Sequence, residues 1–400
     1  MTGCNDFVSL SFSRDSDERA RAAHLAALCY LDHDGPADEH AALYALLIGL
    51  LDDPSVKVRA ALAYGLLHSK AAPRPIILAL LRDSSVIARA IAQYSPILLD
   101  ADLLPLVSTA PLPMLLAVAQ REQLSGRLAA AVIDRGEREP RLLVLRRASV
   151  QVPATSFLGL VDSCKEDAEL RGVLLARTDL PPDVRHRLVQ HAAAALRGAR
   201  IVRGALHQPR LERLFRTAED HALVSIGEGA AEQANSSFAS VLVASDQLST
   251  RLLFHALVSG QVLFFSDCLA QLAGTPRSKV LSLLESGRGA TLHALFSAAG
   301  VPDPVRTVMV RLVQHARAVD LATDVAGRHY VITVVIEELV QEHPEGLPAA
   351  LEEVFAYLNE QNVRLAREAA RDVMSAFVPR TVDAPAITAA PALQLPSAAA

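Results

Sequence analysis

The sequence predicts an all-α protein, built as an α-solenoid followed by a second helical region, and three observations support this. Hydrophobic residues make up 51% of the 400 residues, enough for a large buried core. No stretch shows the glycine-punctuated alternation of β-branched and polar residues that is typical of strands. An internal repeat of about 26 to 30 residues runs through the first half. Because one helical hairpin of that length cannot bury its own apolar face, neighbouring repeats should stack.

The clearest copies of the repeat begin at residues 50 and 80. Residues 50–64, LLDDPSVKVRAALAY, and residues 80–94, LLRDSSVIARAIAQY, share a leucine pair, an aspartate, an arginine six residues later and a final tyrosine. In the first copy, we expect Asp53 to cap a helix and Pro54 to occupy its first position. These assignments leave Arg59, which lies inside an apolar run, without a local role. Weaker copies begin near residues 115, 142 and 174.

The first copy resembles the start of a HEAT-type repeat, whose signature places Asp-Pro before a helix and Val-Arg within it. The matching residues are Asp53, Pro54, Val58 and Arg59. In the second copy, the aspartate and the arginine recur, while serine and alanine replace the proline and the valine. The resemblance implies that each arginine pairs with the aspartate of an adjacent repeat. It therefore implies a structural ladder, and no catalytic role, for Asp53, Arg59, Asp83 and Arg89.

Three stretches together resemble the bacterial family called domain of unknown function 2336. They are LLDDPSVKVRAALA at 50–63, LLARTDLPPDVRHRLV at 174–189, and the segment 256–310, which begins ALVSGQVLFF. The resemblance covers about residues 15 to 320. It implies a fold of helical repeats and, because that family is uncharacterised, no chemistry.

Composition divides the chain into five parts. They are an N-terminal arm (1–15), the repeat array (16–193), an arginine-rich joint (194–216), a second helical region (217–378) and a Pro- and Ala-rich tail (379–400) that should be disordered. Residues 329–343 are β-branched, but their helical neighbourhood favours a buried helix over a strand. Residues 347–377 should form a long amphipathic helix that packs on its own chain, with a homodimeric coiled coil as the alternative.

Charge, cysteines and hydropathy exclude several classes of protein. The 39 Lys and Arg residues face 44 Asp and Glu residues, so the net charge of −5 opposes a dedicated nucleic-acid binder. The four cysteines form no CxxC pair, so neither a zinc ribbon nor a disulfide framework is expected. The N-terminus lacks a secretory signal pattern, and prolines interrupt the longest uncharged run. We therefore expect a cytoplasmic protein without membrane contact.

The sequence contains no strong catalytic motif. Phosphate-binding loops, HExxH and GxSxG are all missing, so we expect no catalytic residue and no cofactor. The nearest approach to a metal site is DHDGPADEH at 32–40, but its Gly-Pro pair indicates a solvated loop, and we expect no metal. His186 and His191 are five residues apart and do not share a helix face as ligands would.

An arginine stripe in residues 194–216 is the most informative exposed pattern. Its two triplets, each with a spacing of three, are Arg197, Arg200, Arg203 and Arg210, Arg213, Arg216. Arginine makes directional, often bidentate contacts with carboxylate and phosphate, which favours a docking patch for an acidic partner or for phosphate. The alternative is a solvated connecting helix whose arginines pair with Glu212, Glu219 and Asp220.

These observations predict a non-catalytic scaffold or adaptor that binds another protein with an acidic surface. One alternative is a HEAT-like nucleic-acid enzyme of the DNA glycosylase type, which the absence of Trp and the 4% aromatic content oppose. Another is a regulatory module that binds a small acidic ligand between the two helical regions, with Arg200 and Arg203 as first candidates.

Overall fold

The computed structural model describes residues 10–205, 207–233, 237–321 and 323–377. These residues form helices and turns and contain no strand, which confirms the all-α prediction. The chain divides into two compact units, Met1–Glu219 (unit 1) and Asp220–Ala400 (unit 2). The expected disordered tail and most of the N-terminal arm lie outside the described residues.

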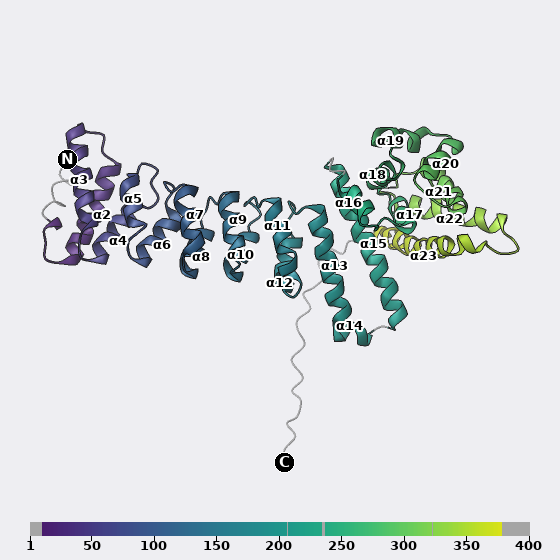
Figure 1. The fold of residues 1–400 in the computed structure, drawn as a ribbon, viewed down its shortest axis with the longest axis horizontal. Helices are drawn as coiled ribbons and strands as arrows, with labels where there is room; N and C mark the ends of the chain where they lie inside the picture. The colour runs from purple at the N-terminus through teal and green to yellow at the C-terminus, as the bar shows by residue number, and fades with distance from the viewer. Residues whose placement is uncertain (1–9, 206, 234–236, 322, 378–400) are drawn as a thin grey trace, which may run out of the picture. The chain divides into compact units, whose positions relative to one another are not determined.

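Unit 1 consists of short helices in two rows (Figure 1). In one row, α2, α4, α6, α8, α10 and α12 contact one another in succession; the other includes the pairs α3 with α5, α7 with α9 and α9 with α11. The bounds are α2 (Ser16–Leu31), α3 (Ala37–Leu51), α4 (Val56–Leu66), α5 (Arg74–Leu80), α6 (Ser85–Tyr94), α7 (Asp100–Thr109), α8 (Leu112–Ala119), α9 (Gly126–Asp134), α10 (Arg138–Leu145), α11 (Ala154–Leu160), η1 (Asp162–Cys164), α12 (Ala168–Leu175), α13 (Pro182–Gly198), α14 (Arg200–Ala205) and α15 (Gln208–Glu232), which crosses into unit 2.

Small residues set the close packing at the start of unit 1. Helix α2 buries five alanines against its neighbours, and α2 and α4 share an extensive contact. A Cβ atom on Gly65 of α4 would lie 2.6 Å from the Cβ atom of Ala27. Glycine at this position therefore allows the two helices to approach at their crossing.

The start of α4 differs from the expectation. The helix begins at Val56 with Ser55 as its N-cap, so Asp53 is not the cap and Pro54 precedes the helix. The Asp53 carboxylate instead accepts a hydrogen bond from the backbone N–H of Ser55 at 2.8 Å, and it forms an ion pair with Arg19. The local sequence favours a cap, but the contact with the preceding repeat takes this carboxylate.

Unit 2 packs around the phenylalanines of its third complete helix, α18. Phe264 and Phe265 are 1% and 0% exposed, and α18 contacts α16, α17, α19 and α20. The bounds are α16 (Ser237–Ala244), α17 (Thr250–Val258), α18 (Val262–Ala273), α19 (Arg277–Ser286), α20 (Gly289–Ala298), α21 (Asp303–Ala316), α22 (Val325–Glu342) and α23 (Ala349–Phe377). Helix α22 confirms that the β-branched segment 329–343 is helical rather than a strand.

The long helix α23 packs on α22 and α21. Leu351, Leu358 and Leu365, spaced by seven residues, are buried on the packed face. Val363 and Val373 remain 51% and 57% exposed. The seven-residue spacing of the leucines on one face explains why α23 packs along its own unit.

Gly227 provides a test of the packing in unit 2. A Cβ atom at this position of α15 would lie 2.2 Å from a ring carbon of the buried Phe264. We expect Gly227→Ala to lower the free energy of unfolding of unit 2 by about 2–3 kcal/mol, because the buried Phe264 ring must shift to make room for the added methyl group. Gly229→Ala is the matched control: nothing lies within 4 Å of that Cβ position, and alanine favours the helix by about 1 kcal/mol. Urea unfolding measures both, and equal effects would contradict the close approach.

Candidate functional site

Ion pairs between arginine and aspartate link successive repeats at the start of unit 1. Arg19 Nε donates to Asp53 Oδ2 at 2.8 Å. Arg59 binds Asp83 through two bonds, from Nε to Oδ2 at 2.7 Å and from Nη2 to Oδ1 at 2.9 Å. Hydrogen bonds from these arginines hold the pKa values of both carboxyl groups below their usual range. Arg59, the arginine inside the apolar run of the first copy, therefore links its own repeat to the next one.

Arg89, the fourth residue of the implied ladder, has a different environment. Its Nε atom donates to the carbonyl oxygen of Ser85 in its own helix, and the described residues give it no carboxylate partner. Thirty residues after Asp83, where the period would place the next aspartate, the chain has Pro113. The series that begins with Arg19 and Arg59 therefore does not continue through Arg89. Further Arg–Asp pairs between repeats join Arg74 to Asp102 and Arg138 to Asp167.

In the later repeats, a second series of arginines binds main-chain carbonyl groups. Each of three arginines follows a helix C-terminus and reaches back to carbonyls at the end of the preceding helix in the same row. Arg121 binds Ala92 and Ser95; Arg147 binds Ala119, Arg121 and Glu122; Arg177 binds Leu145, Arg147 and Val150. Carbonyls at helix ends lack partners within their helix, so these bonds satisfy them across the repeat boundary. Sequence analysis missed this series, although its spacings of 26 and 30 residues match the repeat period.

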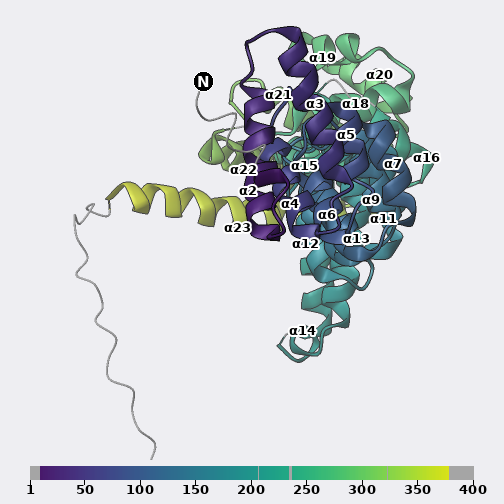
Figure 2. The same ribbon diagram turned by 90° about the vertical axis from the view of Figure 1, so that its left-hand side faces the viewer.

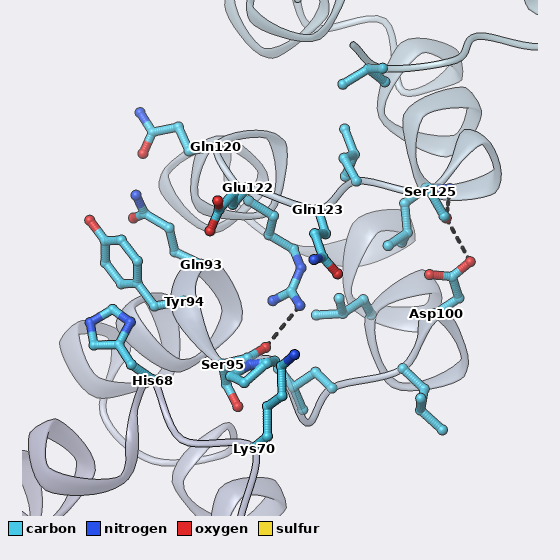
Figure 3. A pocket seen from close by; sticks show the side chains of 18 of the residues that line it. His68, Lys70, Gln93, Tyr94, Ser95, Asp100, Gln120, Glu122, Gln123 and Ser125 are labelled. Atoms are coloured by element: carbon cyan, nitrogen blue, oxygen red, sulfur yellow. Dashed lines mark hydrogen bonds between the residues drawn. The ribbon is translucent and has the colours of Figure 1, made fainter.

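A cavity of about 1350 Å³ lies beside the first of these arginines, Arg121 (Figure 3). Its polar lining comes mainly from the ends of α6 and α8 and the loops that follow them, with further residues from the loops after α4 and α10 and from the start of α7. Figure 3 shows Ser95 and Lys70 at one side and Asp100, hydrogen-bonded to Ser125, at another. The cavity is open to solvent and contains amide, hydroxyl and charged groups above an apolar floor.

The arginine stripe lies on a helical hairpin formed by α13, α14 and the first part of α15. Arg197 on α13 binds Glu219 on α15 at 2.9 Å and stacks over the ring of Phe215, 4.7 Å from its centroid. Both views show α14 at the free end of this hairpin (Figures 1 and 2). The remaining arginines are exposed, and within the described residues they have no ion-pair partner: Arg200, Arg203, Arg210, Arg213 and Arg216.

The histidine-rich segment 32–40 is a loop only up to Pro36, since His40 lies in the first turn of α3, and the segment does not form a metal cluster. Its imidazoles pack instead: His40 stacks on Tyr30 with ring centroids 4.5 Å apart, and His33 lies 5.7 Å from His40. Among the described residues, no group of three or more His, Cys, Asp or Glu side chains is placed to hold a metal ion. His186 and His191 lie on α13, where burial lowers the pKa of each imidazole.

Unit 2 contains a buried polar cluster that sequence analysis also missed. His255 Nδ1 lies 2.7 Å from the hydroxyl oxygen of Tyr357, although the two residues are 102 positions apart. Arg251 stacks over the Tyr357 ring and binds Asp220 at 2.8 Å. Burial lowers the pKa of His255 to about 4 and raises that of Tyr357. A neutral histidine therefore joins α17 to α23.

No helix of the described part of the chain has both the length and the apolar character that a membrane span requires.

Comparison with known proteins gives one family. No curated protein and no solved structure matches the chain. A family model described as an uncharacterised protein conserved in bacteria, DUF2336, matches residues 87–342. Both ends of the match lie later in the sequence than the ends of the expected range, 15 to 320. The matched residues include the arginines that bind carbonyl groups and most of unit 2. Because it covers well over half of the sequence, the chain belongs to the DUF2336 family.

Proposed function

We propose that the protein is a non-catalytic scaffold of the cytoplasm that binds an acidic protein partner through its α13–α15 hairpin. The array that carries this hairpin is, in our proposal, an α-solenoid of HEAT-like repeats. The two rows of contacting helices and the arginine bonds between repeats support it. Such an array keeps a projecting hairpin in a fixed position.

The exposed surface of the hairpin is the observation that carries the proposal. Three large apolar side chains lie exposed there, Leu196 at 53%, Ile201 at 81% and Leu214 at 51%. The arginines that have no ion-pair partner within the described residues lie between and beside these apolar residues in the sequence: Arg200 and Arg203 flank Ile201, and Arg213 precedes Leu214. Apolar side chains together with arginine are typical of the buried centre of protein interfaces.

Charge gives the class of the partner. Among the described residues from 199 to 219, the acids are Glu212 and Glu219, and both lie near Arg197. The other arginines of the hairpin therefore have no further acid in this described stretch to neutralise them. Guanidinium groups bind carboxylates through paired hydrogen bonds. An acidic protein surface with an apolar centre therefore complements this hairpin.

Capture of the partner from native lysate tests the proposal. The bait is the full chain, either wild type or carrying Arg200→Glu, Arg203→Glu and Arg213→Glu. We expect the wild type to retain one protein in near-equal amount, and the variant to lose it by about tenfold or more, because three attractive contacts become repulsive.

A control with the same change in charge separates this docking from a general effect. Arg288, Arg367 and Arg371 are exposed in unit 2, and their replacement by glutamate should leave the capture unchanged. All three proteins must first show matching circular dichroism and thermal melts. Equal loss in both variants, or full retention by the hairpin variant, would contradict docking at the hairpin.

A further inference from the structure

The cavity in unit 1 contains a buried cation that forms no ion pair in the described structure. The Arg121 side chain is 7% exposed, and its two terminal nitrogens donate to the carbonyl oxygens of Ala92 and Ser95. Its Nε atom is buried and has no acceptor in the described structure. The charge of Asp100, an acid of the cavity, favours the charged form of Arg121, but Asp100 forms no ion pair with it and accepts a hydrogen bond from Ser125 at 2.6 Å. Burial of an unpaired charge is unfavourable and calls for an anion.

Related arginines in unit 1 show what Arg121 lacks. Arg177 also reaches back to carbonyls, and it binds the carboxylate of Asp179, two residues later, at 2.7 Å. Arg135 does the same with Glu137, again two residues later and at 2.7 Å. The residue two positions after Arg121 is Gln123. The chain therefore supplies a carboxylate to two of these arginines and an uncharged amide to the third.

Arg147 shows that a missing acid alone is not sufficient for a site. Two residues after it the chain has Ser149, but Arg147 donates to three carbonyl oxygens and is only partly buried. Water can therefore reach its charge. Of the four arginines compared, only Arg121 combines deep burial, an unused buried donor and an adjacent cavity.

The remaining lining of the cavity indicates the class of ligand. Gln93, Gln120 and Gln123 present side-chain amides, which both donate and accept hydrogen bonds and so match the N–H and C=O groups of a peptide backbone. The volume of about 1350 Å³ exceeds the roughly 300–1000 Å³ of pockets for small molecules. Leucines form the apolar floor. Lys70 adds a second cation, and the lining also contains two acids, Asp100 and Glu122, of which Glu122 lies on the side of Gln93 (Figure 3).

We propose that this cavity binds an acidic, leucine-containing peptide segment of another protein, with one of its carboxylates paired to Arg121. The peptide carboxylate takes the role that Asp179 has for Arg177. The glutamines hold the peptide backbone, and the floor takes its apolar side chains. This second binding site is separate from the α13–α15 hairpin.

Fluorescence anisotropy with a defined peptide tests the proposal. The probe is a fluorescein-labelled, amidated peptide of alternating leucine and glutamate, and its counterpart has glutamine in place of glutamate. We expect the wild-type chain to bind the glutamate peptide saturably and about tenfold more tightly than the glutamine peptide. No saturable binding, or equal affinities, would overturn the proposal.

Gln123→Glu is the decisive variant because it keeps Arg121 and the fold. The new carboxylate supplies the missing internal partner, so we expect the melting temperature to rise and the affinity for the glutamate peptide to fall about tenfold. Gln151→Glu makes the same chemical change at an exposed position outside the cavity lining, and it should bind as the wild type does. Unchanged binding by Gln123→Glu would overturn the assignment to the cavity.

The hairpin variant separates this inference from the proposed function. The chain with glutamate at positions 200, 203 and 213 should bind the peptide as tightly as the wild type does. Loss of binding in that variant would show that the peptide occupies the hairpin, and would overturn the cavity site while leaving the hairpin proposal intact.

Discussion

Replacing Arg177 by methionine should lower the free energy of unfolding of unit 1 by about 3 kcal/mol, because three carbonyl oxygens lose their charged donor. The Arg177 side chain is 3% exposed. It binds three carbonyl oxygens and the carboxylate of Asp179 at once. Methionine retains much of the apolar stem but leaves the carbonyls at the end of α10 without these donors. Urea unfolding followed by circular dichroism measures the change.

Arg89→Met is the matched control. Arg89 is partly exposed and donates only to a carbonyl oxygen of its own helix. We expect a change of no more than about 0.5 kcal/mol, as for most surface substitutions. Similar losses in both variants would show that bonds to carbonyls of the preceding repeat contribute no particular stability.

Acidification should destabilise unit 2 through His255. Burial, and after it the charges of His221, Arg364 and Arg251, lower the pKa of this imidazole to about 4. In the unfolded chain the pKa is about 6.5. Because the folded pKa is the lower one, the unfolded state binds the proton first, and stability is full above pH 6.5 and falls as the pH drops toward 4. The full loss is about 3 kcal/mol.

Thermal melts between pH 7.5 and 4.5 test this dependence. The difference between wild type and His255→Gln isolates the contribution of His255 from carboxyl groups such as Glu228, whose pKa burial raises. We expect the variant to lose the acid-sensitive slope, and the control His293→Gln on α20, which is not among the groups that shift the pKa of His255, to keep it. An unchanged slope in His255→Gln would mean that His255 is already protonated in the folded protein.

The helical fold could be predicted because its causes are local. Apolar spacing, the absence of strand patterns and a recurring period are visible in the sequence, and even the β-branched segment 329–343 followed its helical neighbours into α22. The start of α4 could not be predicted as well. Asp53 satisfied the local rule for a cap, but the Arg19 side chain from another helix took its carboxylate.

The contacts between repeats could be predicted only where both partners are side chains. Arg59 and Asp83 recur at related positions and are both recognisable by type. The carbonyl groups that bind Arg121 and Arg177 are present in every residue, so no residue type marks them. The pairing of His255 with Tyr357 depends on how α23 packs on its unit, which no local pattern specifies.

Site-specific photo-cross-linking at the hairpin tests the central claim, docking through α13–α15, most directly. A photoreactive phenylalanine replaces Ile201, which is 81% exposed, or Tyr330, which is 62% exposed in unit 2. In living cells we expect one cross-linked protein from position 201, none from position 330, and loss of the product when Arg200, Arg203 and Arg213 are changed to glutamate. No product from position 201, or a product that persists after the charge reversal, would contradict the scaffold account.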